Sequence, residues 1–199
     1  MFIEKFLLIR MYFKSIFDQA IADHLSVVQR LPELYLEISK LADMMRDCIS
    51  SGGKVIWMGN GGSAADSQHL AAEIVGRFKK ERMGMASIAL TTDSSIITSV
   101  GNDYGFEAIF SRQVEAIGKQ GDILVGITTT GNSGNVVAAI NAGRKMGLVT
   151  VGLLGNDGGK LKSLCDHSII VPSNDTARIQ ESHILIGHIL CEFIEAEDA

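Results

Sequence analysis

Five short apolar runs, separated by segments long enough for helices, constrain the fold of this chain more than any other feature. They lie at residues 55–58, 86–90, 123–127, 149–153 and 168–171. Strands that are apolar along their whole length are buried on both faces, which is typical of a parallel sheet with helices on each side. The pattern therefore predicts a doubly wound α/β fold, with a five-stranded parallel sheet in a three-layer α/β/α sandwich.

Two long helices are expected before the first strand, and another long helix at the C-terminus. Apolar residues recur with helical period over residues 13–28 and 31–49, and Pro32 fits the first turn of the second helix. The sheet layers offer these helices no obvious partner. We therefore expect residues 13–50 to serve helix packing and oligomerisation.

Length and composition exclude several classes of protein. The 199 residues, 46% of them apolar, suit a single domain over residues 1–199. Lys and Arg total 18 against 23 Asp and Glu, a net charge of −5 without a basic stripe, so no nucleic-acid partner is expected. Three cysteines without CxxC spacing favour a reducing, cytoplasmic location, and no run is long enough for a membrane span.

Met11 directly precedes the helical pattern, so residues 1–10 are interpreted as a leader from a misassigned start.

The first apolar run leads into a glycine-rich turn and a helix. Residues 58–63 read Met-Gly-Asn-Gly-Gly-Ser, and a helical pattern follows from Ala64. Such a turn lets the backbone approach a ligand, and the helix N-terminus attracts anions. The turn also satisfies a loosened dinucleotide fingerprint, but the only acidic residue near the required position is Glu81, in a basic segment. A nucleotide site therefore takes second rank, no nucleotide cofactor is expected, and a simple tight turn stays open.

A second turn, after the third apolar run, is rich in hydroxyl groups. Thr128, Thr129, Thr130 and Ser133 precede another helical pattern. Hydroxyl and backbone N–H donors can surround a phosphate without Lys or Arg, although a polar loop with a helix cap remains the alternative. A third loop, residues 101–105, carries polar groups suited to sugar hydroxyls, or is a plain Asn-Asp turn.

Two helices carry groups suited to acid-base or metal chemistry. His69 and Glu73 are four residues apart and share a helix face, where they can meet a ligand or remain a surface pair. Gln180 and His188 lie two turns apart on the C-terminal helix. Periodicity does not show whether these two helices meet. Of the remaining histidines, His24 and His167 are expected in structural or subunit contacts, and His183, one turn from Gln180, is a secondary candidate for lining the site.

From about Met11 to its end the chain resembles the phosphoheptose isomerases of the sugar isomerase (SIS) domain superfamily. The resemblance rests on an ordered set of motifs at residues 59–63, 68–73, 101–103, 131–133, 156–159 and 178–188. It implies conversion of sedoheptulose 7-phosphate to D-glycero-D-manno-heptose 7-phosphate, the first step toward ADP- or GDP-heptose for lipopolysaccharide. It also implies one zinc ion per subunit and a homotetramer with active sites at subunit boundaries.

The resemblance assigns roles residue by residue. Glu73 and His188 are implied as the acid-base pair, and the implied zinc ligands are His69, Glu73, Gln180 and His188. The implied substrate contacts are Asn60, Gly61, Gly62, Ser63, Glu73, Asn102, Asp103, Thr128, Thr129, Thr130, Ser133 and Gln180.

This chain departs from the family pattern at three positions. Thr128 and Thr130 stand where serines are usual, and Ala177 stands where some relatives carry an aspartate that contacts the sugar. A non-catalytic phosphosugar-binding or replication-initiator-associating protein is the alternative function. Relatives of that kind tend to lack the histidine that is present here as His188.

Overall fold

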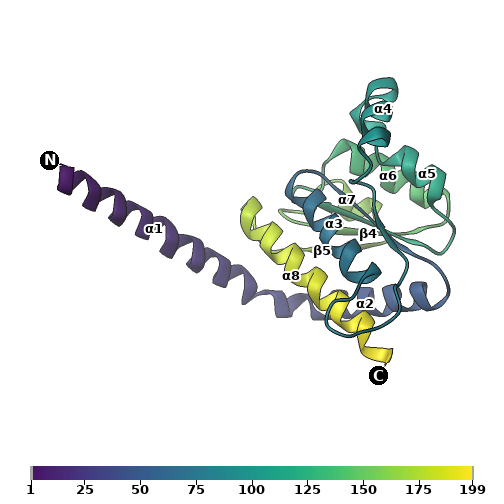
Figure 1. Cartoon of the computed structure of the whole chain (residues 1–199), viewed down its shortest axis with the longest axis horizontal. Coiled ribbons are helices and arrows are strands. Elements are labelled where there is room, and N and C mark those ends of the chain that lie inside the picture. Colours follow the sequence, from purple (N-terminus) through teal and green to yellow (C-terminus); the bar gives the residue numbers. More distant parts are fainter. Residues whose placement is uncertain (1, 199) are drawn as a thin grey trace.

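A five-stranded parallel sheet forms the centre of the structure, a computed structural model that describes residues 2–198 (Figure 1). The strands are β1 (Val55–Gly59), β2 (Ser87–Ala89), β3 (Ile123–Thr128), β4 (Val149–Leu154) and β5 (His167–Ile170), in the order β2-β1-β3-β4-β5. The order reverses direction between β1 and β3, where ligand crevices form in such sheets. The predicted fold is confirmed, and each predicted strand lies within two residues of an observed one.

Helices cover both faces of the sheet. On one face α2 (Tyr35–Ser50), α3 (Gly62–Val75) and α8 (Thr176–Ile194) share an apolar core with alternate residues of β1, Val55 and Trp57. On the other face α5 (Ser111–Ile117), α6 (Gly134–Lys145) and α7 (Leu161–Leu164) pack on Ile56 and Met58. Because successive side chains of a strand point to opposite faces, both sides of β1 are buried, which explains its continuous apolar run.

The first helix, α1 (Phe2–Val28), projects from the body of the protein (Figure 1). A short 3₁₀ helix, η1 (Leu31–Leu34), with Pro32 at its start, joins it to α2. The two long N-terminal helices are therefore confirmed, but α1 begins well before residue 13 and passes through Met11 without a break. The interpretation of residues 1–10 as a leader stays a prediction. Within residues 2–198, none of the helices has the length and apolar character that a membrane crossing requires.

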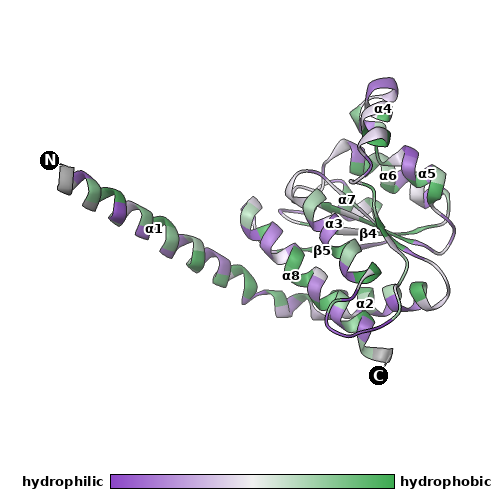
Figure 2. Ribbon diagram, in the orientation of Figure 1, coloured by the Kyte–Doolittle hydropathy of each residue, from purple (hydrophilic) through white to green (hydrophobic). Residues whose placement is uncertain are grey.

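Most of the apolar residues of α1 are exposed to solvent in the single chain. Tyr12 is 70% exposed, Phe13 62% and Phe17 57%, and apolar positions follow one another along the projecting helix (Figure 2). Among the residues of α1 whose side chains the structure describes, those of the C-terminal part are fixed to the body. There Arg178 donates to the Ala20 carbonyl over 2.9 Å, and His24 pairs with Glu181 at 2.8 Å.

The expectation of a loop at residues 101–105 is wrong. Residues 101–104 form the last turn of α4 (Ser94–Tyr104), which ends at Gly105 with a φ of 87°. Asp93 caps the start of this helix by accepting from the Ile96 N–H over 2.9 Å. The polar composition of residues 101–105 concealed this helix. None of the residues of α4 is buried, and η2 (Phe106–Ala108) follows it.

Candidate active site

The hydroxyl-rich turn lies between β3 and α6, at the carboxyl edge of the sheet. The Thr128 and Ser133 hydroxyls bond each other over 3.0 Å. Ser133 occupies the N-cap position of α6, and its hydroxyl accepts no bond from the N–H groups of the helix. The N–H groups of Gly134 and Asn135 at the start of α6, together with these hydroxyls, are thus available to an anion.

The loop after β4 holds this turn in place. Asn156 donates to the Thr129 carbonyl over 2.8 Å, and Leu161 N–H donates to the Gly131 carbonyl over 3.1 Å. Gly131 has a φ of +66°, and a Cβ there would lie 1.9 Å from the Gly158 carbonyl oxygen. Only glycine fits such a position, so the turn has a defined shape before any ligand binds.

A reciprocal amide pair joins the hydroxyl-rich turn to the glycine-rich turn after β1. Asn60 Nδ2 donates to Asn135 Oδ1 over 2.9 Å, and Asn135 Nδ2 donates to Asn60 Oδ1 over 2.8 Å. The Val136 N–H also donates to Asn135 Oδ1, which fixes the orientation of that amide. Sequence reasoning named Asn60 as a site residue but not Asn135, whose partner lies 75 residues away.

Two imidazoles and a carboxylate meet where α3 packs on α8. His188 Nε2 lies 3.1 Å from His69 Nε2, and His69 Nε2 lies 3.0 Å from Glu73 Oε1. The sequence predicted the His69 and Glu73 pair on one helix face, and the structure brings His188 to it from a helix more than a hundred residues away. The Phe78 ring stacks on the His188 imidazole, with centroids 5.1 Å apart and planes inclined by 19°.

The donor set and its spacing fit a zinc ion. A single N–H on His69 Nε2 cannot bond His188 and Glu73 well at once, whereas lone pairs on all three groups can share one cation. The three ligand atoms lie within 4.8 Å of one another. Atoms bound about 2.1 Å from a tetrahedral zinc ion lie roughly 3.4 Å apart, and a His₂Glu set leaves one position open.

The fourth residue of the implied ligand set, Gln180, lies elsewhere in this chain. A Cβ at Gly62 would lie 2.5 Å from Gln180 Nε2, so the Gln180 amide rests against the first turn of α3. Gly62 and His69 are seven residues apart, or about 10 Å along the helix. The α3 and α8 helices therefore carry two groups of site residues, with Gln180 beside the glycine-rich turn and His188 two helical turns further along.

Asp66 lies between these two groups on the same face of α3 as Gly62, His69 and Glu73. Its Oδ2 is buried without a hydrogen-bond partner. Burial raises the pKa of Asp66 to about 6, against the opposing effect of nearby His69. Asp66 is four residues after Gly62 and seven before Glu73, so helical spacing places all three on one face. That spacing could have identified this carboxylate from the sequence.

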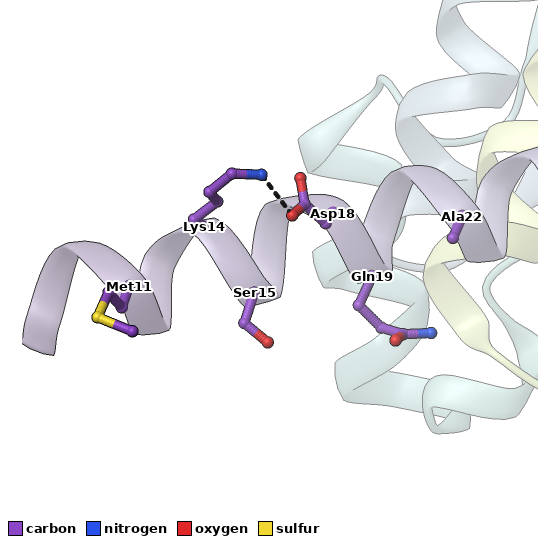
Figure 3. Close-up of a pocket in the computed structure, with 6 residues that line it drawn as sticks. All are labelled: Met11, Lys14, Ser15, Asp18, Gln19 and Ala22. Carbon is purple, nitrogen blue, oxygen red and sulfur yellow. Dashed lines mark hydrogen bonds and ion pairs between the residues drawn. The ribbon is translucent and has the colours of Figure 1, made fainter.

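A hollow of about 490 Å³ along α1 is a poor candidate for an active site. Figure 3 shows its lining residues, which all belong to one helix, with Lys14 and Asp18 paired at 2.6 Å. Because no second element faces them, the structure positions nothing there against a substrate.

Comparison with known proteins identifies the fold and its family. Residues 17–155 match the SIS domain family. A phosphoheptose isomerase of Trichlorobacter lovleyi is 52% identical over 92% of this chain and 93% of its own length, and phosphoheptose isomerase 1 of Campylobacter jejuni is 51% identical over 87% and 93%. The chain belongs to the phosphoheptose isomerase family of SIS domain proteins. The predicted family is thus confirmed, and the protein is an isomerase.

A solved structure supports the same assignment. The phosphoheptose isomerase from Neisseria gonorrhoeae superposes with a TM-score of 0.88 at 41% identity, covering 92% of this chain and 99% of that one. The α/β fold of this phosphoheptose isomerase family member, including its long terminal helices, therefore matches that of a solved relative.

Among the other predicted site residues, Ser63 is buried in the first turn of α3, whereas Asn102 and Asp103 are exposed on the single chain. Asn102 and Asp103 lie at the end of α4 and bond each other over 2.8 Å. The following segment returns to the hydroxyl-rich turn, because Glu107 lies against Gly134, where a Cβ would be 2.7 Å from its Oε1. Ala177 is exposed in the first turn of α8.

The three other histidines of this phosphoheptose isomerase family member lie outside the cluster. His183 is fully buried and bonds the Leu154 carbonyl over 3.0 Å, and burial lowers its pKa to about 4. His24 pairs with Glu181, and His167 begins β5. Buried against β4, His183 does not line the cluster, and the structural or subunit roles of His24 and His167 stay predictions.

Proposed function

We propose that this isomerase converts sedoheptulose 7-phosphate to D-glycero-D-manno-heptose 7-phosphate. The observation that carries the proposal is the meeting of His69, Glu73 and His188 at the α3 and α8 interface, in a chain about half identical to phosphoheptose isomerases. The hydroxyl-rich turn supports it as a phosphate site on the same sheet edge as the start of α3.

The size of the substrate suits the spacing of these features. The glycine-rich turn, bonded to the hydroxyl-rich turn, lies about 10 Å along α3 from His69. An extended seven-carbon chain with bonds of about 1.5 Å spans roughly 10 Å from C1 to the phosphorus. A phosphate held by Thr128, Thr130 and Ser133 therefore leaves C1 and C2 within reach of acid-base groups on α3 and α8.

The proposed chemistry is a proton transfer between C1 and C2. After ring opening, Glu73 removes a proton from C1 while His188 protonates the C2 oxygen, which gives a cis-enediol. Glu73 then returns its proton to C2, and His188 takes the proton from the C1 oxygen, which leaves the aldose. Both groups end in their starting states, so no other proton carrier is needed.

A zinc ion is proposed in the same place, held by His69, Glu73 and His188. Family resemblance adds Gln180 as a further ligand, which requires its amide to leave its place against Gly62. When bound, zinc polarises carbonyl and enediolate oxygens as a Lewis acid. A carboxylate that binds a metal is a weaker base, so the two proposed roles of Glu73 compete. His69 is free of that conflict and acts as a ligand only.

We also propose a homotetramer whose active sites lie at subunit boundaries. Exposed apolar residues along α1 and a groove of about 640 Å³ between η1, α2 and α8 support subunit contacts made by the N-terminal helices. The groove is lined by Val28, Leu31, Pro32, Tyr35, Ile38, Leu185, Ile186 and Ile189. The exposure of Asn102 and Asp103 on α4 is consistent with their serving the site of a neighbouring subunit.

The cellular context follows from the proposed product. A heptose phosphate formed here is the entry compound for ADP- or GDP-heptose and hence for lipopolysaccharide. A cytoplasmic location is proposed because all three cysteines are free thiols.

Conversion of sedoheptulose 7-phosphate by the purified protein, followed by NMR, tests the function. We expect turnover that is lost on chelation, restored by zinc, and abolished by Glu73→Gln with substrate binding retained. Glu192→Gln, which alters an exposed carboxylate at the end of α8, is the matched control. A folded protein without turnover under either metal condition would support the non-catalytic alternative, and activity in Glu73→Gln would contradict the role of Glu73.

A further inference from the structure

The segment after α3 is held to the end of α8 by one buried carboxylate. Glu195 is 2% exposed. Its oxygens accept three consecutive backbone N–H groups, from Phe78 at 2.5 Å, Lys79 at 2.7 Å and Lys80 at 3.1 Å. Such an arrangement fixes the backbone of these residues, because one rigid group satisfies three neighbouring donors.

Arg82 completes this contact and connects it to the candidate base. Its guanidinium lies 3.1 Å from Glu195, with the two side chains 4% and 2% exposed. The same guanidinium donates to the Glu73 carbonyl over 2.9 Å and to the Gly76 carbonyl over 3.1 Å. Burial alone would raise the pKa of Glu195, but the three N–H donors and Arg82 outweigh it and lower the pKa, so the carboxylate is charged.

The segment fixed in this way carries the ring that covers His188. Phe78 stacks on the His188 imidazole at 5.1 Å. Among the described residues, His188 makes its hydrogen bond through Nε2, to His69, and Nδ1 has no partner that would orient the ring. Histidines that bind metals are usually oriented by a hydrogen bond at the other nitrogen. Here the stacked ring is the contact that can set the plane of the imidazole.

We propose that Phe78 and Glu195 are positioning residues for His188, with Glu195 holding the backbone that places the Phe78 ring. The ring keeps the imidazole in the plane that directs Nε2 at His69 and Glu73. This inference rests on the proposed function, since it gives His188 its role, but it concerns residues to which neither the sequence motifs nor the family resemblance assigns a role.

Zinc affinity of the metal-free protein, measured by competition with a chromophoric chelator, tests the proposal. Phe78→Leu removes the ring and keeps the bulk, and should raise the zinc Kd about 3- to 10-fold. Phe78→Tyr keeps the ring and should bind zinc like the wild type. Glu195→Gln loses the charge and one acceptor oxygen, and it should raise the Kd by no more than Phe78→Leu does, because it acts through the Phe78 ring.

The chain offers a matched control for Glu195. Glu192 also joins α8 to this segment, through Lys79 at 2.7 Å, but its side chain is 55% exposed and it bonds no backbone N–H. Glu192→Gln should leave the zinc Kd unchanged. The double variant Phe78→Leu with Glu195→Gln should be no weaker than the weaker single variant, because both changes act through one contact.

A second measurement does not depend on metal. In the metal-free protein the stacked Phe78 ring shields the His188 ring protons, so their NMR resonances should move downfield in Phe78→Leu and in Glu195→Gln, and stay in Glu192→Gln. Unmoved resonances together with an unchanged zinc Kd in Phe78→Leu would overturn the proposal. A lower melting temperature of Glu195→Gln without a change in Kd or resonances would reduce Glu195 to a purely structural role.

The two proposals can fail separately. If the wild-type protein binds no zinc, the metal site is wrong, and the NMR resonances and kcat of Phe78→Leu against Phe78→Tyr decide the positioning role. If Glu195→Gln does not fold, the same pair of Phe78 variants decides it. A loss of kcat at unchanged KM in Phe78→Leu, rescued in Phe78→Tyr, supports positioning, whereas equal kcat in both contradicts it.

Discussion

The amide pair between Asn60 and Asn135 should couple the stability of the two turns that form the proposed phosphate site. Asn135 is 2% exposed and takes part in three hydrogen bonds, two with Asn60 and one with the Val136 N–H. At about 1 kcal/mol for each net bond, Asn135→Ala should lower the free energy of unfolding by about 3 kcal/mol. Asn60→Ala breaks the two shared bonds and should cost about 2 kcal/mol.

A double-mutant cycle isolates the contact between the two turns. Because the two bonds are lost in either single variant, the double variant should cost about 2 kcal/mol less than the sum of the single effects. Urea denaturation of all four proteins at one protein concentration measures this coupling. Asn141→Ala is the control, because Asn141 is exposed on α6 and its side chain makes no hydrogen bond among the residues that the structure describes.

An isosteric variant tests the functional side of the same contact. Asn135→Asp cannot donate to Asn60 Oδ1 and adds a negative charge beside the hydroxyl-rich turn. We expect a raised KM for sedoheptulose 7-phosphate and weaker binding of inorganic phosphate, with a smaller change in kcat. Coupling near zero between Asn60 and Asn135, or a wild-type KM in Asn135→Asp, would refute the reasoning.

Three further outcomes are expected. The pKa of His183 is about 4 in the folded protein and about 6.5 in the unfolded chain, so the unfolded chain binds a proton first as the pH falls. Up to about 3 kcal/mol of the free energy of unfolding is therefore lost between pH 6.5 and pH 4. His183→Gln should flatten this loss in urea titrations across pH. The pKa of Asp66 is raised to about 6, so the cost of ionising its buried carboxyl develops as the pH rises from about 4 to 6. Asp66→Asn should therefore raise the melting temperature more at about pH 7.5 than at about pH 4.5. An equal rise at both pH values would contradict the desolvation argument. Gly62→Ala should leave stability within about 1 kcal/mol but displace the Gln180 amide and lower kcat/KM about tenfold, and unchanged kinetics would show that the position of Gln180 is unimportant.

Local sequence predicted the sheet because each strand is buried on both faces, and burial leaves a continuous apolar run. It failed at α4 because that helix packs on little of the molecule. Ile97 and Val100 of α4 are partly buried against the core, but its last residues read Gly-Asn-Asp-Tyr, a composition that is typical of a turn. The sequence pattern placed the start of the first helix at residue 13, whereas α1 begins at Phe2. A projecting helix continues past the point where its contacts with the body end, so the pattern of buried residues does not mark its start.

Part of the candidate site could be predicted from local sequence, and part could not. The hydroxyl-rich turn and the His69 and Glu73 pair each lie within a single segment, so their spacing alone suggests their chemistry. His188, Asn135 and Glu195 act through partners between 75 and 119 residues away, and no local pattern encodes such contacts. Family resemblance found His188 because it belongs to a motif, but it did not find Glu195, which touches no substrate. A carboxylate that orients another residue's backbone leaves no signature except its burial, and burial is known only once the chain is folded.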